Sequence, residues 1–526
     1  MDWLKGGLSR SRMKAKQAEG ITSLSDASSV ISASKRSKSI SYNLMLAKVK
    51  SLMSRLAKRK VHRIDDIVCN IYLLPVEITA HIFTLLLPRR TITSVPIPTT
   101  TPLLLGAVCS VWRNIIWSLP HFWTDIPVCI SVSKARSKVQ CRLLEEWISR
   151  TDEHLLSFVI RADSGMTLNM WFHGPAYGMI HLICQQSRRW RTIDLDLPFW
   201  VHSSLSDILH DLPHLEVLSL CSTAAGGFLD FLTNFKSSRK LRNLHLCGTG
   251  IFGDLLPYAG LEYFRLSFCR DYECWELLLP EYKVTHLRFE NIISSQGDRG
   301  DNFVILSSVQ TVEMILDSPE VTNSLLNHFL WPGLKSLTIN LSCLIYDFLF
   351  QSISLFCLRS HCCLEHLTLS IICISSFEEQ LIQMLESLPH LISLHLIVVP
   401  QRGAGSLEYW GKNNGQDFCG LSKILFQSLC STEQEFVLPN LEILIYEGPL
   451  SLNAATLDNL LTDRRSPSYP ESQSTDIEIK RTAQLQTVSI KTNDSIENLD
   501  GYLTQFKLLR NQGLDLSLVL DGIERC

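Results

Sequence analysis

Short apolar phrases of the form Leu-x-x-Leu-x-Leu, or a close variant, recur along most of this chain. Within each phrase apolar and polar positions alternate, which is the period of a strand buried on one face. The phrases begin at Trp190, Leu215, Leu241, Leu261, Val284, Val309, Leu334, Leu364, Leu391, Leu441 and Leu485. Their spacings are 25, 26, 20, 23, 25, 25, 30, 27, 50 and 44 residues, so most intervals are similar in length. We therefore expect a repeated unit of one strand and one connection.

Some of these connections carry apolar residues at helical spacing. One such stripe comprises Phe377, Leu381, Met384, Leu385 and Leu388. The two longest intervals coincide with polar segments near 401–416 and 464–475, which we expect to be loop insertions. The segment 513–520 is expected to form a last strand that caps the stack. The repeat length predicts an irregular leucine-rich-repeat solenoid over 140–526, within an α/β fold class. The alternative is a chance cluster of leucines.

Two amphipathic helices are predicted ahead of the repeats. Pro75 suits the start of the first helix, Glu77 complements the positive end of its dipole, and Pro88 ends it. The second is predicted from one continuous helical stripe of Leu105, Val108, Cys109, Trp112 and Ile116. About 60 residues can bury little core of their own, so helices this apolar are expected to need a partner surface.

These two helical blocks resemble the F-box family, in the form common in mushroom-type fungi. The resemblance rests on an ordered set of motifs: Leu-Pro-x-Glu-Ile from Leu74, Ile-Phe at Ile82, a proline-containing loop, Val-Cys-x-x-Trp-Arg from Val108, and Leu-Pro-x-x-Trp from Leu119. It covers roughly residues 67–126. The connection from Pro88 to Pro102 is longer than in a compact F-box.

The resemblance implies a short all-helical F-box-like domain, 67–128, that docks on the Skp adaptor of a Skp–cullin–F-box ubiquitin ligase and through it on cullin. The adaptor-binding residues that it implies are Leu74, Pro75, Ile78, Ile82, Phe83, Val108, Cys109, Trp112 and Ile116. The alternative is that these residues are core, since a small domain shares its apolar residues between core and interface.

Taken with the repeats, the resemblance implies a non-catalytic, substrate-recognition subunit of the ligase, with the repeats binding a protein target. The alternative function is a leucine-rich-repeat interaction scaffold that acts outside any ubiquitin ligase. We expect no membrane partner and no nucleic-acid partner.

Outward strand positions of three adjacent repeats give a candidate target-binding row. The row comprises Asn243, His245, Tyr263, Arg265, His286 and Arg288. Such a row is basic and contains an aromatic side chain. Because arginine pairs bidentately with carboxylate or phosphate, we expect an acidic or phosphorylated target peptide. The alternative is an ordinary solvated strand face.

Charge is unevenly placed along the chain. Residues 1–60 contain 14 Lys and Arg against 3 acidic residues, a balance of +11, which leaves −14 for the remaining 466 residues at the net charge of −3. The first 40 residues, rich in Ser, Lys and Arg, are expected to be disordered, and an amphipathic helix is expected over 41–66. The clusters at 35–38 and 58–60 suit nuclear import signals or a solvated tail without a dedicated role.

The sequence lacks the features expected of membrane-spanning and secreted proteins. No apolar stretch reaches the roughly 18 uncharged residues of a membrane span, and the N-terminus has no apolar secretory signal. The 17 cysteines are scattered over a long chain, as small hydrophobes would be. We expect a cytoplasmic or nuclear protein.

Two motifs in the sequence partly match catalytic or cofactor sites. Gly248–Gly253 matches a dinucleotide fingerprint, but the next phrase begins at Leu261 and leaves no room for the crossover helix. The soft ligands between Cys357 and His366 include no Cys-x-x-Cys pair. We therefore expect no catalytic residue, no metal and no cofactor.

Overall fold

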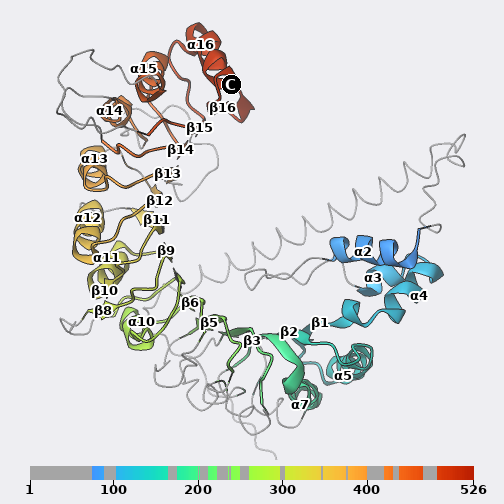
Figure 1. Cartoon of the computed structure of the whole chain (residues 1–526). Coiled ribbons are helices and arrows are strands. Elements are labelled where there is room, and N and C mark those ends of the chain that lie inside the picture. Colours follow the sequence, from blue (N-terminus) through green and yellow to red (C-terminus); the bar gives the residue numbers. More distant parts are fainter. Residues whose placement is uncertain are drawn as a thin grey trace, which may run out of the picture. The chain divides into compact units, whose positions relative to one another are not determined.

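The fold is mixed α/β and is dominated by one 15-stranded sheet (Figure 1). The computed structural model describes residues 74–87, 102–163, 167, 174–198, 201, 211–221, 235, 238–248, 260–295, 303–344, 348–372, 374, 377–399, 420–430, 437–465 and 483–525. The tail expected over 1–40, the helix expected over 41–66 and the insertion expected at 401–416 lie outside these residues. The chain divides into two compact units, Met1–Ile82 and Phe83–Cys526.

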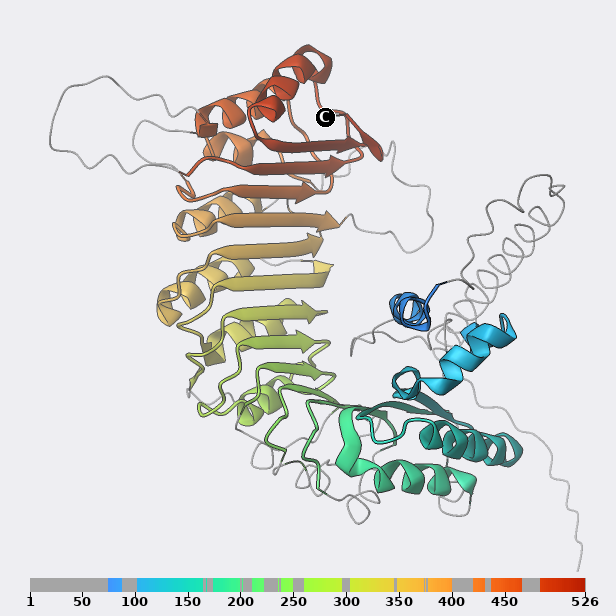
Figure 2. The same cartoon turned by 45° about the vertical axis from the view of Figure 1, so that its right-hand side comes forward.

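The strands of the large sheet lie side by side in the order in which they occur along the chain (Figure 2). They are β1 Asp125–Ile130, β2 Leu156–Ala162, β3 Trp190–Asp196, β4 Val217–Cys221, β5 Asn243–Cys247, β6 Tyr263–Ser267, β7 His286–Glu290, β9 Thr311–Leu316, β11 Ser336–Leu344, β12 His366–Ile372, β13 Ser393–Val399, β14 Ile443–Glu447, β15 Thr487–Thr492, β16 Asp515–Leu520 and β17 Ile523–Glu524. All neighbours are parallel except β16 and β17. Strands β8 Val304–Ile305 and β10 Phe329–Leu330 form a separate parallel pair.

Helices occupy many of the connections between strands and cover one face of the sheet (Figure 1). The α-helices are α2 Val76–Leu86, α3 Pro102–Gly106, α4 Ser110–Ser118, α5 Lys134–Ser149, α7 Pro175–Gln185, α10 Asp271–Leu277, α11 Pro319–His328, α12 Phe348–Ser360, α13 Glu378–Glu386, α14 Lys423–Ser428, α15 Ala454–Arg465 and α16 Leu499–Asn511. Short 3-10 helices are η2 Pro120–Trp123 and η3 Ser187–Arg189. Among the helices described, none has both the length and the apolar character of a membrane span.

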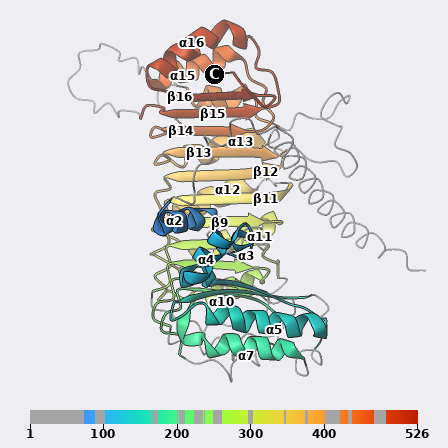
Figure 3. The same ribbon diagram turned by 90° about the vertical axis from the view of Figure 1, so that its right-hand side faces the viewer.

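The apolar phrases of the sequence form the strands. Each of the eleven phrases overlaps one strand, and the segment 513–520 contains β16 (Figure 3). In β9, for example, Val312, Met314 and Leu316 are buried and alternate with less buried residues. The leucine that opens a phrase is buried as well, although it precedes the strand, as at Leu261. Each fully buried leucine of this kind contributes about 1.5–3 kcal/mol, so the repeated phrase builds one continuous core.

The sheet starts earlier in the chain than the repeats predict. Strands β1 and β2 precede the first phrase, and the expected boundary at residue 140 falls inside α5. The reason is that alternating residues of β1, Ile126, Val128 and Ile130, join the same hydrophobic core as the later strands. They belong to the sheet although they do not fit the leucine phrase.

The predicted single helix through Leu105 and Ile116 is wrong, because the structure has two helices there. Helix α3 ends at Gly106, and Cys109 has an extended backbone, φ −156° and ψ 170°. Its Sγ accepts a hydrogen bond from the Trp112 N–H at 3.4 Å, so it caps the start of α4. This capping conformation interrupts the helix that the apolar spacing predicts.

The polar segment predicted as an insertion at 464–475 begins with helical residues. Arg464 and Arg465 are the last residues of α15, and Arg464 is only 1% exposed. Its guanidinium donates to the carbonyl oxygens of Leu429 and Leu438, both at 2.8 Å, and of Val437. Burial lowers the pKa of Arg464 to about 10. The remainder of that segment, 466–475, lies outside the described residues.

Candidate functional site

Apolar side chains are unusually exposed in the N-terminal helical block, which we define as the described residues 74–87 and 102–123. Of the 23 large apolar side chains that are exposed in the described chain, ten lie in these 36 residues. They are Leu74, Val76, Ile78, Leu85, Leu86, Leu103, Leu104, Val108, Val111 and Trp117, with exposed fractions of 40–71%. The block therefore leaves much of its apolar surface uncovered.

The nine predicted adaptor-binding residues separate into three groups. Leu74, Pro75, Ile78 and Val108 are exposed, Ile82, Cys109 and Trp112 are half-buried, and Phe83 and Ile116 are fully buried. The Phe83 ring lies 4.7 Å from the Trp112 ring and 6.4 Å from the Phe122 ring. Phe83 and Ile116 are thus core residues, whereas the exposed group is available to a partner.

Seven exposed apolar residues of the block are not among the predicted adaptor-binding residues. They are Val76, Leu85, Leu86, Leu103, Leu104, Val111 and Trp117. They lie in short helices that contain the predicted positions or directly precede them, so the signal in the sequence was an apolar content higher than one helical stripe requires.

Trp123, at the end of the Leu-Pro-x-x-Trp motif, connects α4 to α5 at the start of the sheet. Its indole N–H donates to the carbonyl oxygen of Ile116 at 2.9 Å. Its ring lies 5.1 Å from the ring of Trp147 in α5, whose indole N–H donates to the Trp123 carbonyl oxygen at 2.7 Å. The Arg150 guanidinium lies 4.9 Å above the Trp123 ring. This motif residue has a structural role.

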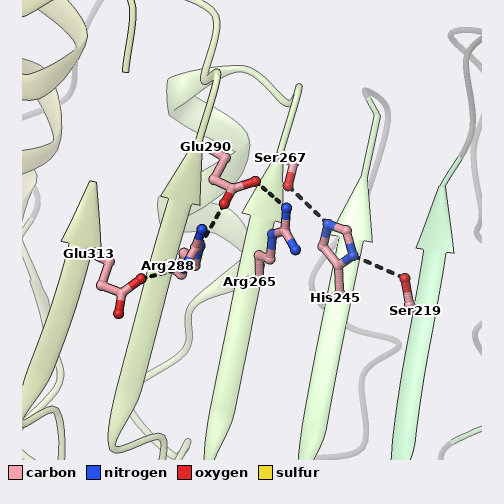
Figure 4. Close-up of polar contacts among 7 residues, drawn as sticks. All are labelled: Ser219, His245, Arg265, Ser267, Arg288, Glu290 and Glu313. Atoms are coloured by element: carbon pink, nitrogen blue, oxygen red, sulfur yellow. Dashed lines mark hydrogen bonds and ion pairs between the residues drawn. The ribbon is translucent and has the colours of Figure 1, made fainter. Parts of the chain in front are cut away.

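The second candidate site is the polar face, which we define as the outward positions of strands β2 to β9. The register places His245 beside Arg265, Arg265 beside Arg288, and Arg288 beside Glu313 (Figure 4). The neighbouring row holds Asn243, Tyr263 and His286 in the same order. The six residues predicted as a target-binding row are therefore side by side, as expected.

His245 is a neutral member of this face. It is 6% exposed, with Nδ1 2.9 Å from Ser219 Oγ and Nε2 2.9 Å from Ser267 Oγ (Figure 4). Burial, together with the nearby Arg265 charge, lowers the pKa of His245 to about 3. The ring therefore carries no charge at neutral pH, and it joins three strands by hydrogen bonds.

The prediction that the row is basic is wrong, because its arginines are already paired. Arg265 pairs with Glu290 (Figure 4). Arg288 pairs with Glu290 at 2.5 Å and with Glu313 at 2.6 Å. Glu313 lies at the register position of Arg288 on the next strand, and Glu290 lies two residues after Arg288 in β7. Together they supply the compensating charge. The row is an internally neutralised network.

A third arginine extends the network toward the start of the sheet. Arg161 in β2 makes two hydrogen bonds to Asp194 in β3, at 3.0 and 2.6 Å, and lies 3.6 Å from Asp196. The pKa of Arg161 is raised by this carboxylate pair despite its burial. Across β2 to β9, three arginines face four carboxylates.

The structure describes one of the two sequence motifs that resemble cofactor or metal sites in part and the other in full. Gly248 follows β5 with φ +122°, and residues 249–253 lie outside the described chain. Cys357 is buried in α12, whereas Cys363 is exposed. Within the described ranges no group of three or more His, Cys, Asp or Glu side chains could hold a metal ion.

Comparison with known proteins gives no relative: no family model matches the chain, and no curated protein matches it significantly. The F-box and leucine-rich-repeat assignments therefore stay predictions from the sequence, and function is argued from the two candidate sites.

Proposed function

We propose that this chain is the target-recognition subunit of a Skp–cullin–F-box type ubiquitin ligase. The N-terminal helical block acts as an F-box that docks on the Skp adaptor. The strand array is an irregular leucine-rich-repeat solenoid, and its polar face holds a protein target. The chain contributes proximity between target and conjugating enzyme, and no catalytic residue of its own.

The observation that carries the proposal is the exposed apolar surface of the block. In α3, α4 and the turn between them, Leu103, Leu104, Val108 and Val111 are 44–61% exposed, above a core that contains Ile116. Monomeric proteins rarely leave large contiguous apolar patches uncovered, so a concentration of this kind marks a binding surface. The resemblance of the ordered motifs in the same residues to the F-box favours a Skp adaptor as the partner.

Co-purification of the full chain with a Skp-type adaptor tests this function. Val108→Asp should reduce adaptor binding at least about tenfold, because it places a charge in the apolar interface. Val139→Asp is the matched control: Val139 is 57% exposed, against 61% for Val108, but lies in α5 outside the block. Trp112→Ala is less informative, because its ring packs against Phe83.

Two results would contradict the proposal. One is absence of the adaptor from the wild-type complex, which would favour a scaffold acting outside any ligase. The other is equal adaptor binding by Val108→Asp and Val139→Asp.

A further inference from the structure

Two of the four carboxylates of the polar face, Asp196 and Glu313, are more exposed than its arginines, whereas Asp194 and Glu290 are 9% and 10% exposed. The side chains of Arg265, Arg161 and Arg288 are 14%, 24% and 24% exposed. Those of Asp196 and Glu313 are 43% and 37% exposed. At Asp196 and Glu313, a ligand approaching the face therefore meets a carboxylate before it meets a guanidinium group.

Asp196 is the least compensated of these carboxylates. Both terminal nitrogens of Arg161 are committed to Asp194, so Asp196 has only Arg161 Nε, at 3.6 Å. No described residue donates a hydrogen bond to its side chain. Partial burial raises the pKa of Asp196, and the attraction of Arg161 offsets this only in part. A second cationic group beside Asp196 would give its carboxylate a further partner.

Glu313 offers a similar unfilled position at the far end of the network. Its Oε2 accepts a hydrogen bond from Arg288 Nη1 at 2.6 Å. Its other oxygen, Oε1, accepts no hydrogen bond from any residue in the described part of the chain. Glu313 can therefore accept from an added ammonium or guanidinium group without losing its present partner.

Phe268 follows β6, which lies between β3 and β9 in the strand order, and it has an exposed aromatic ring and a strained backbone. It is 50% exposed and has φ +53°. The equivalent positions after β5 and β7 are Gly248 and Asn291, which tolerate positive φ. Phenylalanine does not, and the cost is about 1–2 kcal/mol. Ile293, which pairs with Arg270 two residues after Phe268, is 47% exposed.

We propose that the polar face binds a basic, extended segment of a protein target, with lysine or arginine side chains on Asp196 and Glu313 and an apolar side chain on Phe268. This inference rests on the proposed function in taking the polar face as the target site. It reverses the sign of the target expected from the sequence, because the arginines of the face are paired, while Asp196 and Glu313 each keep an oxygen that accepts no hydrogen bond from a described residue.

The sheet geometry sets the spacing of the basic residues. From β3, which carries Asp196, to β9, which carries Glu313, there are five steps between neighbouring strands. At about 4.8 Å per step this is about 24 Å, or about seven residues of extended chain. Phe268 follows β6, three steps from β3, so the apolar residue lies about four residues after the first cation.

The test is fluorescence anisotropy of labelled ten-residue peptides with the full chain. One peptide carries Lys at positions 1 and 8 and Leu at position 5 in a Ser/Gly background. A second carries Glu in place of both Lys, and a third carries phosphoserine there. The Lys peptide should bind at least about tenfold more tightly than the other two, and its affinity should fall as salt is raised.

Matched variants locate the binding. Asp196→Asn with Glu313→Gln should weaken the Lys peptide at least about tenfold. Glu145→Gln with Glu386→Gln changes net charge equally, but on exposed positions of α5 and α13, and should leave the affinity unchanged. Tighter binding of the Glu or phosphoserine peptide, no binding of any peptide, or equal effects of the two double variants would overturn the inference.

One further variant distinguishes a target from this chain's own basic residues. Changing Lys35, Arg36 and Lys38 to Glu in the full chain should leave peptide affinity unchanged, and a tenfold gain would show that this segment occupies the face instead. Adaptor co-purification separates the two proposals. A chain that retains the adaptor but not the Lys peptide refutes only this inference, and a chain that binds the peptide without the adaptor refutes only the ligase function.

Discussion

The N-terminal helical block and the strand array differ in whether their apolar residues are exposed or buried. The array places them in one continuous core that extends from Ile126 to Leu520, and it pairs polar groups with one another on the polar face. The block keeps a few large residues buried, such as Phe83 and Ile116, and leaves ten others exposed. The array therefore supplies its own stabilising contacts, whereas the block leaves apolar surface exposed, which under the proposed function an adaptor covers.

The largest expected effect contrasts one residue from each region. Leu337→Ala in β11 removes a fully buried side chain and should lower the free energy of unfolding by about 2–5 kcal/mol. Val108→Ala in the block removes an exposed side chain and should change it by less than about 0.5 kcal/mol. Urea unfolding of both variants measures this. A loss above about 2 kcal/mol for Val108→Ala would break the comparison.

The next effect tests whether polar groups in the array are as necessary as its leucines. Arg464→Met keeps most of the side-chain volume but removes the donors to the carbonyl oxygens of Leu429, Val437 and Leu438. We expect a loss of about 2–4 kcal/mol in urea unfolding, because three buried hydrogen bonds from the guanidinium are lost. Arg465→Met, at the partly exposed neighbour, should cost about 0.5 kcal/mol and serves as control. Equal effects would contradict this role for Arg464.

A smaller effect concerns pH. His245 has a folded-state pKa of about 3, below its ordinary value of 6.5, so the unfolded chain binds more protons between these values. Stability from His245 is present above pH 6.5 and is lost as the pH falls toward 3. At pH 5 the loss is about 2 kcal/mol relative to pH 7. His245→Gln should remove this part of the pH dependence of urea unfolding. An unchanged slope between pH 7 and 5 would show that the ring is not held neutral.

The smallest effect is a gain in stability. Phe268→Asn replaces a residue strained at φ +53° with one that tolerates this backbone, and should raise the free energy of unfolding by about 1 kcal/mol. Phe303→Asn is the control: Phe303 is 51% exposed but lacks a positive φ, so no gain is expected. If both variants gain equally, Phe268 is not strained, and the argument that its aromatic ring is retained for binding fails.

The strands could be predicted from the sequence because each phrase carries its own burial pattern. Strand β1 was not predicted, because its core residues, Ile126, Val128 and Ile130, form a shorter pattern without the opening leucine. The interruption of the helix at Cys109 was not predicted, because apolar spacing does not reveal that a thiol will cap a helix.

The polar face was half predictable. Its register followed from aligning the phrases, which placed Arg265 beside Arg288. Its charge did not, since Glu290 lies one residue after its phrase and Glu313 lies in the loosest phrase. The neutral state of His245 depends on burial and on side chains from other strands, which no single phrase contains.

The order of the strands in the sheet also bears on how the molecule comes apart. Within the large sheet, each described strand pairs only with the preceding and following strands of that sheet, so β3 pairs with β2 and β4 alone among the described strands. Local damage at β14 therefore leaves the backbone pairing of β3 intact, because no long-range strand pairing connects them. In amide hydrogen exchange, contiguous groups of strands should therefore lose their protection together. One end of the sheet can then unfold while the other end stays folded and able to hold a ligand.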